Sequence, residues 1–275
     1  MITTLDGLKL YVKEWPVENP KAVVVLVHGY GEHIGRYEYV AAALNRAGYT
    51  VIGADHRLHG RSEGLPRAYV TKIDQLVDDL KLVWDKAKHP DKPTFMLGHS
   101  MGGLVAACFA LRHQDEMQGL VTSGAALPSR ESISVTLISA VRLIAKTAPW
   151  VPSLRIYGRS LSHDPQIAAS YDSDPLNHHG AMKAATLWAC VKAGGDAIQH
   201  AHTLKIPLLM LHGGKDRVVP NKATQTFFER AGAQDKTLKI YPGLFHEIFN
   251  EPEKDEILQT LVTWLDAHLF ASNEK

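Results

Sequence analysis

Short apolar runs separated by longer amphipathic segments constrain the fold of this 275-residue chain more than any other feature. The run Lys21–Val27, KAVVVLV, is continuous and rich in β-branched residues, which is typical of a strand buried on both faces. The segment Ile73–Lys88 instead repeats its apolar residues every three or four positions, the spacing of one helix face. Alternation of these two patterns predicts an α/β protein, with a mainly parallel central sheet flanked by helices.

The same two patterns recur along the chain. Further strands are predicted at Leu8–Trp15, Tyr49–Ala54, Thr94–Leu97, Gly119–Ser123, Pro207–His212 and Thr237–Tyr241. Further helices are predicted at Arg36–Ala47, Leu104–His113, Asn221–Ala231 and Glu256–Leu269. The earliest strand precedes the first helix, so it could pair antiparallel at the edge of the sheet.

The alternation stops between about Pro128 and His202. We predict a core of residues 1–127 and 203–275, and a helical cap (lid) of residues 128–202, inserted after the sixth strand. Residues 128–160 contain the basic residues Arg130, Arg142, Lys146, Arg155 and Arg159 but one acidic residue, Glu131. The apolar face of the cap is expected to cover the site, and an alternative is that part of this surface also touches a lipid interface.

The segment Gly98–Gly102, GHSMG, lies between a predicted strand and an apolar helix. This is the G-x-S-x-G pattern in the strand–turn–helix setting that presents a serine hydroxyl as a nucleophile. The sharp turn leaves no room for side chains at the two outer glycines, and the helix N-terminus favours a developing negative charge. We predict Ser100 to be the catalytic nucleophile; a glycine-rich structural turn is the alternative.

A serine hydroxyl needs a base, which is usually oriented by an acid. Two later predicted strands each lead through a glycine turn to a suitable side chain, Asp216 after one and His246 after the next. Both should lie near Ser100, at the carboxyl ends of the parallel strands. The order Ser, acid, His along the chain is that of the α/β-hydrolase fold. We predict His246 as the base and Asp216 as its orienting acid, although Asp216 could instead cap the following helix. The spare acids, Asp196 and Asp235, do not follow a strand.

An anionic tetrahedral intermediate requires hydrogen-bond donors, which form an oxyanion hole. One donor should be the backbone N–H of Met101, the residue after the nucleophile, and the other should come from the loop after the early strand. That loop is His28–Gly31, and the N–H of Tyr30 is the best candidate. Losing one such donor typically slows an enzyme by about 100- to 1000-fold.

No motif indicates a cofactor or a catalytic metal. The histidines that are close in sequence are His56 and His59, His178 and His179, and His200 and His202. None of them forms H-E-x-x-H or has a third ligand placed by pattern. The loop Gly29–Gly31 also fails the G-x-G-x-x-G spacing of a nucleotide site, because residue 34 is isoleucine.

Composition argues against several other classes of protein. A net charge of +1 gives no reason to expect a nucleic-acid partner. The two cysteines, Cys108 and Cys190, do not make a disulfide framework and are expected to be small buried residues. The N-terminus lacks the pattern of a signal peptide, and no run of about 18 apolar residues predicts a membrane span. A cytoplasmic location, with peripheral contact at membranes, is the default expectation.

Blocks spread over nearly the whole chain resemble those of monoacylglycerol lipases, within the serine aminopeptidase S33-like hydrolases. The blocks are His28–Tyr37, Asp55–Arg57, His59–Gly60, Ser62–Gly64, Gly98–Gly103, Asp172–Leu176, Tyr241–Glu247 and Asn250–Glu251. Proteins called lysophospholipases share this pattern. The resemblance implies a cap over an acyl channel and hydrolysis of monoacylglycerols to glycerol and a free fatty acid, without a cofactor. A lysophospholipase, a broad carboxylesterase and a non-catalytic ligand-binding relative are the alternatives.

The resemblance also suggests residues near the glycerol end of the substrate. Matching positions place Glu32, Arg36 and Tyr171 there. The alternative for Glu32 and Arg36 is a structural ion pair that holds the oxyanion loop. The chain departs from the family pattern at three positions: Tyr30 replaces a small or aliphatic residue, Leu58 a glycine and Ile34 a frequent serine. These departures leave the acyl-chain and head-group preferences open.

Overall fold

The computed structural model describes residues 1–128 and 133–269, with a seven-stranded sheet at its centre. In chain order, the strands of this sheet are β3 (Val12–Trp15), β4 (Ala22–Val27), β5 (Tyr49–Ala54), β6 (Thr94–His99), β7 (Gly119–Ser123), β10 (Leu208–Gly213) and β11 (Lys236–Tyr241). In space they follow the order β11–β10–β7–β6–β4–β5–β3, and all neighbours are parallel except β3 and β5. The predicted parallel sheet with an antiparallel edge strand is therefore confirmed.

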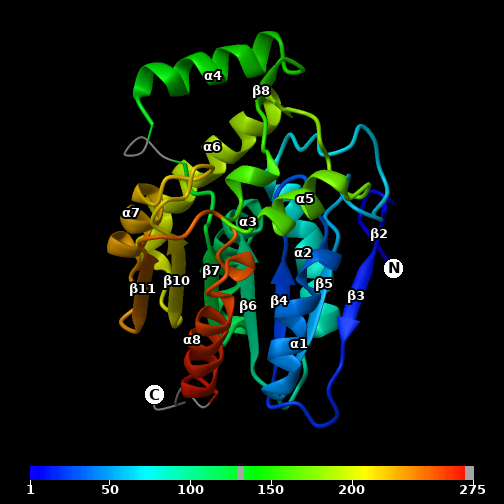
Figure 1. The fold of residues 1–275 in the computed structure, drawn as a ribbon, viewed down its shortest axis with the longest axis vertical. Helices are drawn as coiled ribbons and strands as arrows, with labels where there is room; N and C mark the ends of the chain where they lie inside the picture. The colour runs from blue at the N-terminus through cyan, green and yellow to red at the C-terminus, as the bar shows by residue number, and fades with distance from the viewer. Residues whose placement is uncertain (129–132, 270–275) are drawn as a thin grey trace.

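Helices cover both faces of the sheet (Figure 1). On one face lie α1 (Glu38–Arg46) and α8 (Lys254–Ala267); on the other lie α2 (Ile73–Ala87), α3 (Met101–His113) and α7 (Lys222–Arg230). Successive side chains of a strand point to opposite faces, so Val23 and Val25 of β4 join one apolar core while Val24 joins the other. Every residue of β4 is consequently buried, as its unbroken apolar run predicts.

One helix begins earlier than the sequence predicts. The helix expected from Leu104 starts at Met101, directly after the serine turn. Gly102 and Gly103 carry no side chain, so they hide the apolar spacing by which the first turn of a helix is recognised.

The chain leaves the main sheet between β7 and β10. This segment contains α4 (Val135–Thr147), β8 (Pro152–Leu154), the 3₁₀ turn η3 (Gly158–Ser160), α5 (Pro165–Ser173), β9 (Met182–Lys183) and α6 (Ala184–His200). It lies above the carboxyl ends of the parallel strands, with α4 outermost (Figure 1). Arg130 and Glu131 lie outside the described residues. Counted from β1 (Ile2–Thr3), with β2 (Lys9–Leu10) and β3 taken as one strand, β7 is the sixth.

The outermost helix, α4, has no buried residue among those described. It packs along α6, and at its far end Trp150 stacks on Tyr69, a residue of the loop before α2, with ring centroids 4.0 Å apart. None of the helices within residues 1–128 and 133–269 combines the length and the apolar composition that a membrane-spanning helix needs.

Candidate active site

Ser100 lies in the sharp turn between β6 and α3. Its backbone has φ 54° and ψ −121°, a left-handed conformation that non-glycine residues rarely adopt. The flanking glycines are required by close approach: a Cβ on Gly98 would lie 2.5 Å from the carbonyl oxygen of Gly102, and one on Gly102 would lie 2.2 Å from that of Val27. The turn therefore forces Ser100 out of the strand at the end of the sheet, where its side chain borders a cavity although the residue is only 7% exposed.

Ser100, His246 and Asp216 form a continuous chain of hydrogen bonds. The Nε2 atom of His246 lies 2.9 Å from Oγ of Ser100, and its Nδ1 atom lies 2.7 Å from Oδ2 of Asp216. Asp216 follows β10 and His246 follows β11. Because these strands and β6 are parallel, all three side chains lie at the carboxyl ends of the strands. The arrangement can transfer a proton from the serine to the imidazole.

Asp216 and His246 each stabilise the charged form of the other. Burial alone would raise the pKa of Asp216, but the positive charge of His246 and hydrogen bonds from His212 and His246 outweigh it and hold that pKa far below its usual range. Burial alone would lower the pKa of His246, but the carboxylate of Asp216 outweighs it and raises that pKa. The histidine is thereby made a better proton acceptor.

The two predicted oxyanion donors, Tyr30 and Met101, border the cavity that contains Ser100. Among residues 1–128 and 133–269, neither backbone N–H has a hydrogen-bond acceptor, so both could bind an anionic oxygen. The loop carrying Tyr30 is held at Gly29, whose N–H donates to Oε1 of Glu32 at 2.6 Å and whose carbonyl oxygen lies 2.8 Å from Nδ1 of His28.

Arg36 connects the loop of Tyr30 to the segment of His246. Its guanidinium lies 2.6 Å from Oε2 of Glu32 and 2.7 Å from Oε1 of Glu247. Burial would raise the pKa of both glutamates, but the charge of Arg36 outweighs it and lowers both pKa values. This geometry supports the loop-holding alternative for Glu32 and Arg36. Glu247 has no role predicted from the sequence, although its position directly after the candidate base was an available signal.

Tyr171 contacts Arg36 from the segment above the sheet. The centre of the Arg36 guanidinium lies 4.9 Å from the Tyr171 ring centroid, and both side chains are largely buried. Neither of these residues, nor Glu32, lines the cavity at Ser100. They instead border the loop that carries Tyr30: Glu32 accepts from the N–H of Gly29, and a Cβ on Gly31 would lie 3.6 Å from the hydroxyl of Tyr171.

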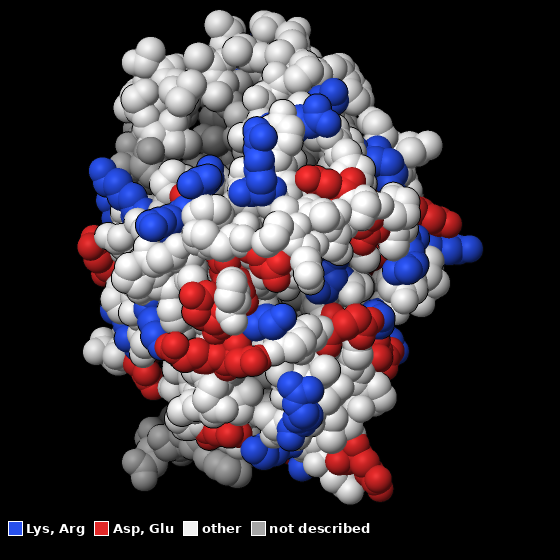
Figure 2. Space-filling model, in the orientation of Figure 1, with Lys and Arg blue, Asp and Glu red and all other residues white. Residues whose placement is uncertain are grey.

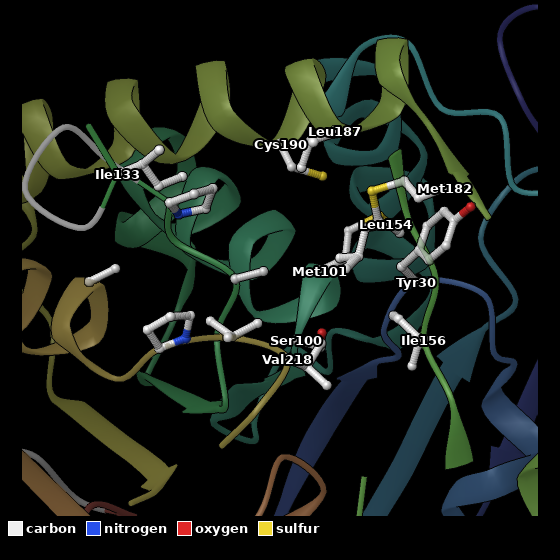
Figure 3. A pocket seen from close by; sticks show the side chains of 15 residues that line it. Tyr30, Ser100, Met101, Ile133, Leu154, Ile156, Met182, Leu187, Cys190 and Val218 are labelled. Atoms are coloured by element: carbon white, nitrogen blue, oxygen red, sulfur yellow. The ribbon is translucent and has the colours of Figure 1, made fainter. Parts of the chain in front are cut away.

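An apolar cavity of about 170 Å³ opens above Ser100. In Figure 3, Ser100 lies at its floor near Val218, with Tyr30 and Met182 to one side and Leu187 and Cys190 of α6 above. The remaining lining residues are Met101, Ala126, Pro128, Ile133, Leu154, Ile156, Val219, Pro220 and Ala223. This lining suits a hydrocarbon chain attached to the group that Ser100 attacks.

The histidine pairs and spare acids do not belong to the Ser100–His246–Asp216 series, although the rings of His59 and His178 lie 5.8 and 6.2 Å from that of Tyr30. His56 and His59 pack in a buried cluster behind the Tyr30 loop, and burial lowers the pKa of His59 to about 3. No group of three or more potential ligand residues in the described part of the chain could hold a metal ion. Asp196 pairs with Lys192 on the surface, and Asp235 pairs with His268. Neither acid contacts His246.

Known proteins share this fold over nearly their full length. The model of the family described as serine aminopeptidase, S33, matches residues 18–253. A monoacylglycerol lipase of Mycolicibacterium smegmatis is 37% identical, over 96% of this chain and 95% of its own. The monoglyceride lipase of Rattus norvegicus is 33% identical, over 100% of this chain and 92% of its own. A soluble variant of the monoglyceride lipase of Saccharomyces cerevisiae, solved with a substrate analog, superposes with a TM-score of 0.86 at 25% identity, covering 98% of this chain and 94% of that one.

Proposed function

The chain belongs to the serine aminopeptidase S33 family of hydrolases, and from this premise we propose that it cleaves carboxylic esters of fatty acids through an acyl-enzyme on Ser100. The proposed substrates are monoacylglycerols, which yield glycerol and a free fatty acid. The observation that carries the proposal is the hydrogen-bonded series Ser100–His246–Asp216 beneath an apolar cavity. Names of relatives with similarity over the whole chain agree with this substrate class.

The proposed reaction has two halves that use the same groups. His246 Nε2 takes the proton of Ser100 as Oγ attacks the ester carbonyl carbon, and the resulting oxyanion accepts hydrogen bonds from the Tyr30 and Met101 N–H groups. Collapse of this intermediate expels the alcohol, which receives the proton from His246. Water then attacks the acyl-enzyme with His246 again as the base, and the fatty acid leaves as Ser100 regains its proton.

A fluorophosphonate probe tests the nucleophile directly, because it reacts covalently with an activated serine. We expect labelling of the wild-type protein and none of Ser100→Ala. The exposed Ser170→Ala is the matched control and should label like wild type. Labelling that survives in Ser100→Ala would refute the assignment, and an unlabelled wild type would favour a non-catalytic relative that binds the ligand without turnover.

The alcohol preference requires a separate comparison. We propose that Glu32, Arg36 and Tyr171 act near the glycerol end of the substrate through the Tyr30 loop that Glu32 and Arg36 hold. The values of kcat/KM for a monoacylglycerol, lysophosphatidylcholine and a short p-nitrophenyl ester should be highest for the monoacylglycerol. A highest value for lysophosphatidylcholine would indicate a lysophospholipase, and one for the short ester a broad carboxylesterase.

The proposal extends to residues 128–202 as a cap that contacts lipid surfaces peripherally. Large apolar side chains of α4 are exposed to solvent, with Leu143 61% and Val135 59% exposed. On the face shown in Figure 2, the surface over α4 is almost free of charge, and Lys and Arg side chains lie below it. The helix itself carries Arg142 and Lys146. An apolar patch bordered by basic residues is typical of a surface that meets a membrane.

Vesicle sedimentation tests this contact. Charge reversal at two basic residues of α4, Arg142→Glu with Lys146→Glu, should weaken binding to vesicles that contain phosphatidylglycerol. The matched control reverses Lys86 and Lys88, which are exposed at the other end of the sheet, and should leave binding unchanged. Equal binding by both double variants would remove the proposed role of α4.

A further inference from the structure

His212 lies against the candidate acid, but the proposed reaction gives it no part. It belongs to β10, and its side chain is completely buried. The Nε2 atom lies 2.9 Å from the carbonyl oxygen of Val219 and 3.0 Å from Oδ2 of Asp216. A carbonyl oxygen only accepts hydrogen bonds, so Nε2 carries a proton. This N–H faces two acceptors, Asp216 and Val219, in the loop between β10 and α7, which we call the acid loop.

The other ring nitrogen of His212 contacts a buried hydroxyl. Its Nδ1 atom lies 2.9 Å from Oγ1 of Thr224, a completely buried residue of α7, beside β10 at one end of the sheet (Figure 1). With the proton on Nε2, the lone pair of Nδ1 accepts a hydrogen bond from this hydroxyl. The Val219 carbonyl and the Asp216 carboxylate therefore place the proton on Nε2, and the Thr224 hydroxyl supports this tautomer by satisfying the buried Nδ1.

The acid loop is held from both sides of Val219. The N–H groups of Val218 and Val219 donate to Oδ1 of Asp216 at 2.8 Å each, while the carbonyl group of Val219 accepts from His212. Both carboxylate oxygens of Asp216 thus have donors besides His246. Rotation of the carboxylate away from His246 would break several buried hydrogen bonds at once.

We infer that His212 is a positioning residue, which holds Asp216 in the orientation that aligns His246 with Ser100, and that the hydroxyl of Thr224 supports the tautomer of His212 that does so. The inference rests on the proposed function, because it requires Asp216 to orient the base. Functional side chains depend on neighbours that lock their geometry, and a fully buried histidine with both nitrogens engaged can provide such a lock.

Two substitutions of His212 separate its N–H from its shape. His212→Phe keeps a flat ring but has no donor, whereas His212→Gln loses the ring but retains an amide N–H. We expect His212→Phe to lower kcat by about tenfold to a hundredfold with little change in KM, the order expected for one hydrogen bond to a charged group. His212→Gln should recover most of kcat. Full activity of the Phe variant, or an impaired Gln variant beside an active Phe variant, would overturn the inference.

Thr224→Val provides a milder test if His212→Phe does not fold. The control is Thr186→Val, which also removes a buried hydroxyl, one that accepts from the N–H of Val70 away from the acid loop. We expect Thr224→Val to lower kcat and Thr186→Val to retain it, with thermal unfolding monitored for both. Equal values of kcat would overturn the inference. Labelling of wild-type Ser100 distinguishes this failure from failure of the proposed function, because it does not depend on these variants.

Discussion

Arg36 and Glu247 form a two-point ion pair across 211 positions of sequence. Nη1 of Arg36 lies 2.7 Å from Oε1 of Glu247, and Nη2 lies 2.8 Å from Oε2. Because Nη1 also contacts Glu32, one buried cation joins the loop of the Tyr30 N–H to the residue after His246. The proposed base and one proposed oxyanion donor are therefore held relative to each other through a single side chain.

Arg36→Ala should destabilise the protein strongly, because it leaves two buried carboxylates without their counter-ion. We expect a loss of about 3–5 kcal/mol in the free energy of unfolding, measured by urea denaturation. The control is Lys192→Ala, which breaks an exposed ion pair with Asp196 and should cost at most about 1 kcal/mol. Similar losses in the two variants would show that the buried network adds little stability.

The rate should depend on pH through His246. The base must be neutral to accept a proton, and its pKa is raised: burial acts to lower it, but the charges of Asp216, Glu247 and Glu32 outweigh burial. Wild-type kcat/KM should therefore fall as pH drops through a value above the ordinary histidine pKa of about 6.5. In Asp216→Asn the largest raising influence is absent, so the residual activity should persist to lower pH. An acid limb that lies at the same pH in Asp216→Asn as in wild type, or at a higher pH, would contradict this prediction.

The cavity above Ser100 should set the acyl-chain preference. Cys190→Phe adds bulk to a lining of limited volume, so we expect kcat/KM to fall more for long-chain than for short-chain esters. Cys190→Ala is the matched control and should leave the ratio of the two values near that of wild type. An equal fall for both chain lengths in the Phe variant would place the acyl chain elsewhere.

Two adjacent glycines of α6 should respond oppositely to substitution by alanine. A Cβ on Gly195 would meet no atom within 4 Å, so Gly195→Ala should stabilise the protein by about 0.5–1 kcal/mol through improved helix propensity. A Cβ on Gly194 would lie 2.6 Å from the carbonyl oxygen of Pro128, so Gly194→Ala should destabilise it. Thermal unfolding of the pair measures both effects. A change in stability of the same sign in both variants would contradict the close packing of α6 at Gly194 against Pro128.

Local sequence accounts for most of the secondary structure. The predicted strand Gly119–Ser123 matches β7 residue for residue, and most other predicted elements differ from the observed ones by one or two residues at an end. The elements are readable because burial on two faces produces an unbroken apolar run, while burial on one helix face produces a spacing of three or four. At Leu58, where the family pattern has glycine, the chain adopts φ 67°, which explains why glycine suits that position.

The sequence by itself also determined which residues to expect at the edge of the sheet. The carboxyl ends of parallel strands lie on the same side of a sheet, so Ser100, Asp216 and His246 could be placed together without knowledge of any distance. Only the tertiary structure decided that Arg36 pairs with Glu247 and that His212 faces Asp216. These contacts require side chains from separate elements to approach each other within hydrogen-bond distance, 2.7 Å in one case and 3.0 Å in the other. No local pattern encodes that approach, because it follows from the packing of the whole chain.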